Sequence, residues 1–304
     1  MKFLITGGTG NIGSFLIEEI LSRGYSVNYL TRNQSKIKHS PNLNGFFWDI
    51  DEQIIDQKCL DGITHIVHLS GESISKRWTK DRKKKILSSR LLTTKLLFKS
   101  LKKHRSLSKV KHIVCASAIG IYESSYYKIF DEESKCEPNT FLQQVVKKWE
   151  NEIQKFKNIG LNITIFRIGL VLSRRGGIIK TLKTPTKLNI SAPIGNGNQY
   201  QSWIHEFDLR NMIIESINKK WYGVYNAVSP NPVKQKKFIK LYANSLSKYT
   251  FPIHIPKVII RLFFGEMSIL IFNSQYVDAS KITNLGFNFK FSKLEKALYN
   301  LVDK

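Results

Sequence analysis

The sequence predicts an α/β protein in which a doubly wound parallel sheet is followed by a smaller, mainly helical C-terminal cap. Strand and helix patterns alternate over the first two thirds of the 304 residues, which is typical of a parallel sheet covered on both faces. A glycine-rich turn joins the first strand to the first helix, as in Rossmann folds. After Pro230-Asn231-Pro232 the chain becomes mainly helical and rich in Phe. We therefore expect a Rossmann core over 1–230, with a loop and helix excursion around 171–200, and a substrate-side cap over 231–304.

The individual elements follow from hydrophobic periodicity and from helix stop signals. Residues 3–6 form a short apolar run that ends in glycines, and 14–23 carries apolar side chains at helical spacing before Gly24. Further strands are expected at 27–30, 46–48, 63–69, 110–116, 163–168, 202–204 and 224–227, and helices at 79–103, 139–157 and 207–217.

The strongest local signal is the glycine loop that follows the first strand. Its spacing fits Gly-x-Gly-x-x-Gly, and a position between a strand and a helix is the context that a dinucleotide-binding turn requires. Glycines let the backbone turn sharply and approach a pyrophosphate, while the helix N-terminus offers N–H groups and a positive dipole to the phosphates. A glycine-rich turn without a ligand is the structural alternative. The predicted pyrophosphate-binding residues are Gly7, Gly8, Thr9, Gly10, Asn11, Ile12 and Gly13.

The end of the second strand predicts the choice of cofactor. An NAD enzyme usually has an Asp or Glu about 20 residues beyond the glycine loop, where the carboxylate binds the ribose 2′-hydroxyl. Here the strand ends in Tyr29-Leu30-Thr31-Arg32-Asn33, with no acidic residue. Arg32 can pair with a 2′-phosphate through charge-assisted hydrogen bonds, although a surface arginine after a strand is the alternative. We therefore predict NADP(H) rather than NAD(H).

The net charge of +25 has two explanations. A nucleic-acid or membrane-surface binder would be basic. However, most of the 48 Lys and Arg residues are Lys, and they are spread along the chain. Asn and Ile are also abundant, and this composition is what an AT-rich genome would produce. We favour the second explanation and expect no specific nucleic-acid partner and no membrane. With three Cys and no signal-peptide or metal-site pattern, a cytoplasmic location is expected.

Several segments beyond the glycine loop form a combination that is specific, although each piece alone is not. The segments are Leu30-Thr31-Arg32, Trp48-Asp49, Leu69-Ser70-Gly71-Glu72, Arg77-Trp78, Ser89-Arg90, Thr93-Thr94, Ala116-Ser117-Ala118-Ile119-Gly120-Ile121-Tyr122, Trp149-Glu150, Arg167-Ile168-Gly169, Ser202-Trp203-Ile204-His205, Asn226-Ala227-Val228, Phe264-Gly265-Glu266-Met267 and Gly286-Phe287. Together with the glycine loop they resemble the atypical extended short-chain dehydrogenases/reductases called the epimerase family, part of the NAD-dependent epimerase/dehydratase superfamily with its characteristic C-terminal domain.

The resemblance implies further cofactor contacts. Thr31 would flank the 2′-phosphate together with Arg32, and Asp49 would occupy the place where related enzymes contact adenine. A turn aspartate at a strand end is an equal alternative for Asp49. Arg90 would line the cofactor groove from the helix at 79–103, where one more solvated cation is the alternative. The segment that would run beneath the cofactor is Leu69, Ser70 and Gly71.

The catalytic pattern of short-chain dehydrogenases is incomplete in this chain. These enzymes use Tyr-x-x-x-Lys on one helix, because residues four apart share a face and the lysine lowers the tyrosine pKa. The chain has no Tyr-x-x-x-Lys, and apolar residues fill those positions in the helix at 139–157. The candidates that remain are Ser117, Tyr122 and Glu72, each of which has an ordinary structural alternative: a strand-end cap, a packed ring and a partner of a basic residue.

Two functions are compatible with these residues. The first is an NADP(H)-dependent oxidoreductase or sugar-nucleotide-epimerase-like enzyme, whose small polar substrate would lie near Glu72, Arg77, Trp78 and Tyr122. The second is a cofactor-binding protein without catalysis, serving as a sensor or scaffold. No metal is expected, since His65 and His68 are three apart on a predicted strand and point to opposite faces. The sequence leaves the oligomeric state open.

Overall fold

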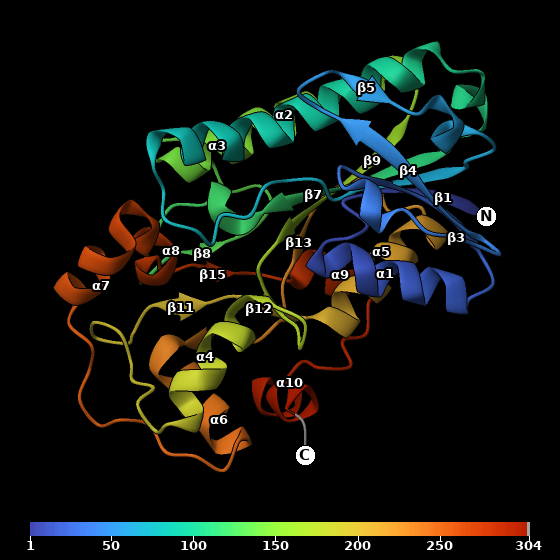
Figure 1. Cartoon of the computed structure of the whole chain (residues 1–304). Helices are drawn as coiled ribbons and strands as arrows, with labels where there is room; N and C mark the ends of the chain where they lie inside the picture. The colour runs from blue at the N-terminus through green and yellow to red at the C-terminus, as the bar shows by residue number, and fades with distance from the viewer. Residues whose placement is uncertain (303–304) are drawn as a thin grey trace.

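The central feature of the protein is a mostly parallel sheet with helices on both faces, seen in a computed structural model that describes residues 1–302 (Figure 1). The nine strands of the sheet are β1 (Lys2–Thr6), β2 (Ser26–Thr31), β3 (His39–Ser40), β4 (Leu43–Asp49), β5 (Ile54–Ile55), β6 (His65–His68), β7 (His112–Ala118), β9 (Asn162–Ile168) and β13 (Gly223–Ala227).

The strand order reverses direction at β1, which makes the sheet doubly wound. The order is β13-β9-β7-β6-β1-β2-β4-β3, and β5 pairs with β4 outside this path. All pairs are parallel except those of β3 and β5 with β4. β1 lies between β2 and β6, so its carboxyl end is the switch point where doubly wound sheets bind ligands.

Four long helices cover the two faces of the sheet. α1 (Asn11–Ser22) and α5 (Glu206–Asn218) pack together on one face, and α2 (Lys80–Lys103) and α3 (Phe141–Gln154) pack together on the other (Figure 1). The predicted α/β fold class is thereby confirmed. The 3-10 helices are Gln34–Lys36, Gln57–Leu60, Arg105–Lys109, Ile119–Ile121, Lys155–Ile159 and Gly265–Ser268.

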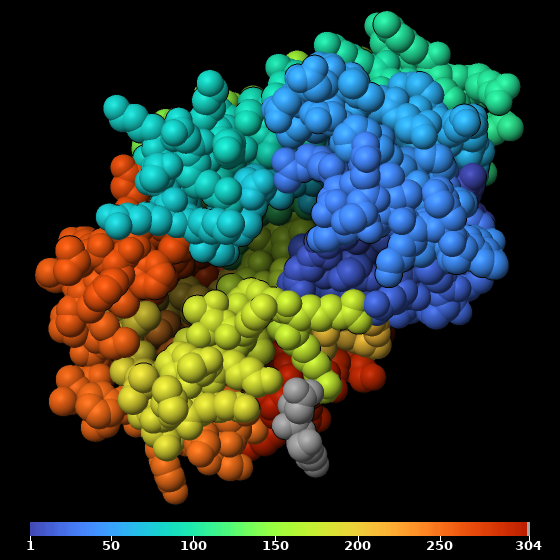
Figure 2. Space-filling model, in the orientation of Figure 1, coloured from blue at the N-terminus to red at the C-terminus, as the bar shows by residue number. Residues whose placement is uncertain are grey.

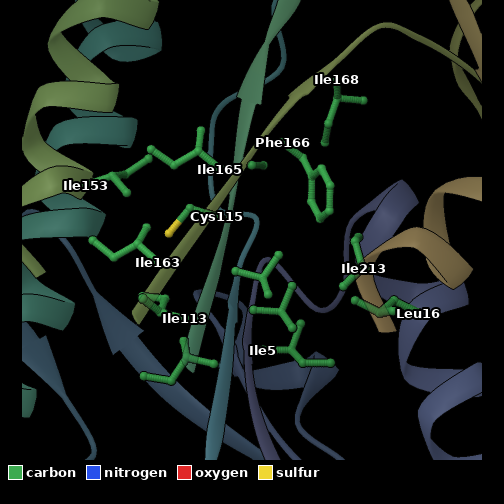
Figure 3. Close-up of a cluster of buried hydrophobic side chains, with 14 of the residues drawn as sticks. Ile5, Leu16, Ile113, Cys115, Ile153, Ile163, Ile165, Phe166, Ile168 and Ile213 are labelled. Carbon is green, nitrogen blue, oxygen red and sulfur yellow. The ribbon is translucent and has the colours of Figure 1, made fainter. Parts of the chain in front are cut away.

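The core lies between the sheet and these helices. β6 is buried along its whole length, as expected for a central strand of a parallel sheet whose two faces are both covered. Fully burying one Ile or Leu side chain stabilises the fold by about 1.5–3 kcal/mol, so the many branched residues of β1, β7 and β9 dominate this core. Figure 3 labels ten buried side chains of this core, which come from these three strands and from α1, α3 and α5: Ile5, Leu16, Ile113, Cys115, Ile153, Ile163, Ile165, Phe166, Ile168 and Ile213.

A second group of elements lies beside the carboxyl edge of the sheet. It is mainly helical and holds three two-stranded sheets, in agreement with the predicted helical cap. Its strands are β8 (Ile129–Phe130), β10 (Leu170–Leu172), β11 (Tyr200–Gln201), β12 (Trp203–His205), β14 (Val233–Lys234) and β15 (Tyr276–Val277), and its helices are α4 (Gly177–Lys187), α6 (Gln235–Ser245), α7 (Lys257–Phe264), α8 (Ile269–Phe272), α9 (Ser280–Asn284) and α10 (Leu294–Leu301).

Buried side chains cross the predicted boundary at residue 230 in both directions. Trp203 and Ile179 pack with Phe238 of α6 in a second apolar cluster. Val277 and Phe287, from beyond residue 230, pack instead into the core of the main sheet. The boundary between core and cap therefore stays a prediction.

Most predicted elements lie within a few residues of the observed ones, and the differences have local causes. The helix predicted at 139–157 begins at Phe141, because the Thr140 side chain and Gln143 form a capping box, and α3 ends at Gln154 before a 3-10 turn. The strand predicted at 46–48 is longer and begins at Leu43. Within residues 1–302, no helix is long and apolar enough to cross a bilayer.

Candidate functional site

The glycine loop has the tight geometry that a dinucleotide-binding turn needs. Gly7 has a φ of +70°, and the amide of Gly10 donates to the Gly7 carbonyl at 3.0 Å. Gly10 is also the residue that precedes α1. A Cβ on Gly13 would lie 2.3 Å from the Gly7 oxygen and 2.7 Å from the Gly8 Cα. The loop and the first turn of α1 therefore pack so closely that only glycine fits at this position.

The segment after β6 lies directly beneath the loop. The amides of Leu69 and Ser70 both donate to Oγ1 of Thr6, at 3.2 and 3.3 Å. The same hydroxyl pairs with Nδ1 of His68 at 2.8 Å. A Cβ on Gly7 would lie 3.0 Å from the Leu69 carbonyl. These contacts place the ends of β1 and β6 together at the switch point of the sheet.

A cleft of about 200 Å³ opens between the glycine loop, the end of β2 and the segment after β6. It contains nine of the residues predicted from the sequence: Gly7, Thr9, Gly10, Thr31, Arg32, Leu69, Ser70, Gly71 and Glu72. It is also lined by five residues that were not predicted as site residues: Leu30, Trp48, Ile50, Ser89 and Thr93.

The structure brings two arginines to Glu72 at the rim of this cleft. Nη2 of Arg32 lies 3.2 Å from one Glu72 carboxylate oxygen, and Nη2 of Arg82 lies 3.0 Å from the other. Burial by itself would raise the pKa of the Glu72 carboxyl, but hydrogen bonds and charges from Arg32 and Arg82 together lower it below its ordinary value. Glu72 is therefore an ionised carboxylate held between two cations.

Asp49 does not line the cleft, although both of its neighbours, Trp48 and Ile50, do. Its Oδ1 accepts hydrogen bonds from the amides of Asp51 and Glu52, at 2.9 and 3.1 Å. This geometry matches the alternative interpretation of Asp49 as a turn-stabilising residue. The apolar residues on either side of it, Trp48 and Ile50, line the cleft in its place.

Arg90 supports the floor of the cleft from α2. Its Nη1 donates to the Glu72 carbonyl at 3.1 Å, and its guanidinium lies 5.2 Å from the centre of the Trp149 ring. A Cβ on Gly71 would lie 3.1 Å from the guanidinium carbon. Burial lowers the pKa of Arg90 to about 10. Arg90 is thus a partly buried residue that holds the Glu72 backbone in place rather than a solvated cation.

The two hydroxyl candidates for catalysis lie in a buried network on the other side of the switch point, at and beyond the end of β7. Oγ of Ser117 donates to Glu150 at 2.6 Å, and Glu150 forms an ion pair with Arg167. Nη1 of Arg167 donates to the Tyr122 hydroxyl at 3.0 Å, and that hydroxyl donates to Asn226 at 2.7 Å. Burial raises the pKa of Tyr122 to about 12, against the opposing charge of Arg167. The sequence pattern did not show this network, because its members come from four separate segments.

Apolar side chains face the end of β7 where a short-chain dehydrogenase carries its Tyr-x-x-x-Lys pair. Leu142 and Val146, four residues apart on α3, lie 3.9 and 4.0 Å from the position of a Cβ on Gly120. Both are buried. This face of α3 therefore presents apolar side chains, and no titratable pair, at these two positions.

The surface is hollowed between the N-terminal part of the chain and the segments coloured yellow and orange (Figure 2).

Two other predicted residues, Trp78 and Asn11, do not line the cleft. Trp78, predicted beside the substrate, is buried instead, with its ring 5.3 Å from that of Phe141 and its Nε1 donating to the Ile74 carbonyl. Asn11 faces the second group of elements, and its side chain accepts a hydrogen bond from Ser173 at 3.1 Å. Among residues 1–302, no group of three or more His, Cys, Asp or Glu could hold a metal.

A family model described as the NAD dependent epimerase/dehydratase family matches residues 3–227. The chain belongs to this family. A second model, a domain of unknown function named DUF1731, matches residues 255–301. Curated relatives include epimerase family proteins of Staphylococcus aureus, strain MRSA252, with 33% identity over 100% of this chain and 99% of the relative, and of Staphylococcus epidermidis, with 33% identity over 99% of both. The resemblance to the epimerase family is thereby confirmed.

Solved structures of epimerase family members share the fold over the whole chain. The human epimerase family protein SDR39U1, solved with NADPH, is 28% identical over 99% of both chains, with a TM-score of 0.84. A nucleoside-diphosphate sugar epimerase from Corynebacterium glutamicum is 26% identical over 98% of this chain and 57% of its own, with a TM-score of 0.77. Several other structural neighbours, each under 25% identical, support the fold alone.

Proposed function

We propose that this epimerase family member binds NADP(H) in the cleft at the switch point and acts as an oxidoreductase or epimerase-like enzyme on a small polar substrate. The observation that carries the proposal is the position of Arg32. It directly follows β2 in the wall of the cleft, on the adenosine side of the glycine loop, and no acidic residue lies at the end of that strand. The NADPH in the human relative's structure supports the same choice.

The cleft residues divide the work of binding between them. The glycine loop presents backbone N–H groups and the N-terminus of α1 to the pyrophosphate. Thr31 and Arg32 bind the 2′-phosphate, and Trp48 and Ile50 provide apolar surface for the adenine. Leu69, Ser70 and Gly71 form the floor. The net charge of +25 creates a positive potential around the protein, which attracts an anionic cofactor. We propose no nucleic-acid or membrane partner and a cytoplasmic location.

The substrate is proposed to enter through the hollow between the sheet and the second group of elements (Figure 2). A bound nicotinamide supplies hydride transfer there. Glu72 contacts Arg32, so it lies toward the adenosine end of the cleft and not beside the transferred hydride. Ser117 and Tyr122 lie on the nicotinamide side, but either hydroxyl must leave its buried partner before it exchanges a proton with a substrate.

A second function, cofactor binding without catalysis, is favoured by this same network. Both hydroxyl candidates already have hydrogen-bond partners within the protein, and α3 carries no Tyr-x-x-x-Lys pair. A sensor or scaffold of this kind would bind NADPH as tightly as an enzyme does. It would not oxidise the bound NADPH, whichever substrate is added.

The two functions are separated by one pair of measurements. Fluorescence titration of the purified protein with NADPH and with NADH tests binding, and we expect NADPH to bind more tightly. Turnover of bound NADPH against a panel of metabolites, including nucleotide sugars and small ketones, tests catalysis. Equal affinities for the two cofactors would overturn the NADP(H) proposal, and a panel without any turnover would favour the sensor or scaffold.

A further inference from the structure

A chain of three charged side chains spans the rim of the proposed cofactor cleft. Arg32, at the end of β2, contacts one oxygen of Glu72, and Arg82, near the start of α2, contacts the other. The arginines therefore share one carboxylate, at 3.2 and 3.0 Å. No sequence pattern predicts this arrangement, because the three residues come from different elements.

The three members of this chain differ in how firmly they are held. The backbone of Glu72 is fixed from two sides, since its amide donates to Ser89 and its carbonyl accepts from Arg90. Arg82 is only 16% exposed and also donates to the carbonyl of Ser73. Arg32 is 57% exposed, and Glu72 is its one ion-pair partner in the part of the chain that the structure describes. Arg32 is thus the member that is free to exchange partners.

We propose that Glu72 competes with the cofactor's 2′-phosphate for Arg32, and that it thereby sets how strongly the protein prefers NADP(H) to NAD(H). The inference rests on the proposed NADP(H) function. A carboxylate and a phosphate accept hydrogen bonds from the same face of a guanidinium, so binding of the phosphate exchanges one anion for another on Arg32. Arg82 keeps its contact with Glu72, so the released carboxylate is not left unpaired.

The two cofactors respond differently to this exchange. NADP(H) must displace Glu72 from Arg32 to obtain the full contact, and it also places a phosphate close to a second negative charge. NAD(H) has an uncharged 2′-hydroxyl and requires neither step. Glu72 therefore weakens the binding of NADPH more than that of NADH, and the resulting selectivity for NADPH is smaller than Arg32 alone would give.

The test is the ratio of NADPH to NADH affinity in Glu72→Gln, measured by fluorescence titration at constant ionic strength. The Arg32–Glu72 pair is half exposed, so we expect NADPH to bind about two- to five-fold more tightly, with NADH little changed. Glu18→Gln is the matched control, because it also removes one carboxylate from an arginine pair, with Arg175 at 2.7 Å, but lies outside the cleft. The control is expected to leave the ratio unchanged.

A double-mutant cycle separates competition from a general loss of negative charge. In an Arg32→Ala background, Glu72→Gln has no arginine to release, so the gain in NADPH affinity should disappear. Glu72→Asp, which keeps the charge but shortens its reach to Arg32, should give a smaller gain and serves if the Gln variant folds poorly. The inference is wrong if Glu72→Gln leaves the ratio unchanged or lowers it, or if the gain persists without Arg32.

The failure of this inference is distinguishable from failure of the proposed function. If the unaltered protein does not distinguish NADPH from NADH, the NADP(H) proposal itself fails. If it prefers NADPH and the preference does not respond to Glu72, only the competition is disproved.

Discussion

Oγ of Ser117, at the end of β7, donates a 2.6 Å hydrogen bond to Oε1 of Glu150 on α3. The same carboxylate pairs with Arg167 through both oxygens, at 3.0 Å each. The serine proton thus points into a buried ion pair and not toward the cleft. This relationship explains why a serine at the expected place in the sequence does not by itself indicate a proton-transfer site.

Removal of one partner from this ion pair should destabilise the fold strongly. Glu150 and Arg167 are each 10% exposed, and an uncompensated buried charge costs about 3–5 kcal/mol. We expect Glu150→Gln to lower the free energy of unfolding by that amount in urea denaturation. Glu152→Gln, on the same helix, breaks a pair whose lysine is 51% exposed and should cost less than about 1 kcal/mol. Equal losses in the two variants would contradict a structural role for Glu150.

Tyr122→Phe should affect stability more than cofactor binding. The variant removes the hydrogen bond that the Tyr122 hydroxyl makes with each of Asn226 and Arg167, at a cost of about 1–3 kcal/mol. NADPH affinity should stay within about twofold, since the hydroxyl does not line the cleft. Tyr299→Phe, at an exposed tyrosine, is the control. If single-turnover hydride transfer to a substrate found in the metabolite panel is lost while stability is kept, Tyr122 acts as the acid.

Arg32→Ala should abolish the preference for NADPH. Loss of a hydrogen bond to a charged group costs about 1.5–3 kcal/mol, or about 10- to 150-fold in affinity, for NADPH only. Titration of both cofactors measures the change. Arg105→Ala removes an arginine of the same charge at an 88% exposed position outside the cleft and should change neither affinity. A parallel loss of NADH binding would show that Arg32 contacts a part that the two cofactors share.

Gly13→Ala should weaken both cofactors alike. The added Cβ overlaps the Gly7 oxygen at 2.3 Å, and overpacking costs about 1–3 kcal/mol. Because the loop must shift away from the pyrophosphate, we expect about 10- to 100-fold weaker binding in titrations, with the fold retained by circular dichroism. Gly120→Ala, where the nearest atom is 3.9 Å away, should bind normally. Unchanged binding in Gly13→Ala would argue against a pyrophosphate at this loop.

Acidification should destabilise the protein through its buried histidines. Burial lowers the pKa of His68 to about 4, below the ordinary value of 6.5, so its native ring stays neutral while the unfolded chain takes up a proton. The contribution of the neutral His68 ring to the free energy of unfolding is fully present above pH 6.5. It is lost as pH falls toward 4, and the loss amounts to at most about 3 kcal/mol.

The measurement is urea denaturation at pH 7, 6 and 5 for the unaltered protein and His68→Gln. The free energy of unfolding of the variant should fall less steeply with decreasing pH than that of the unaltered protein, whatever its value at pH 7. His254→Gln, at an exposed histidine, should keep the original slope. Identical slopes in the protein and in His68→Gln would contradict a neutral buried His68.

Local sequence determined the α/β alternation, the glycine loop and the position of Arg32. Each depends on residues close together in the chain: apolar runs, helical spacing, and glycines between a strand and a helix. For the same reason the missing Tyr-x-x-x-Lys pair could be seen without coordinates, since it concerns two residues four apart on α3. The predicted elements therefore lie close to the observed ones.

Tertiary structure alone decided what the candidate side chains contact. Tyr122 and Asn226 are 104 residues apart and Arg32 and Glu72 are 40 apart, yet each pair is hydrogen-bonded. Such contacts depend on how strands order themselves in the sheet and how α2 packs above it, and these arrangements leave no periodic trace in the sequence. Residue types predicted a catalytic serine and tyrosine; burial and long-range pairing placed both hydroxyls in a buried network that does not line the cleft.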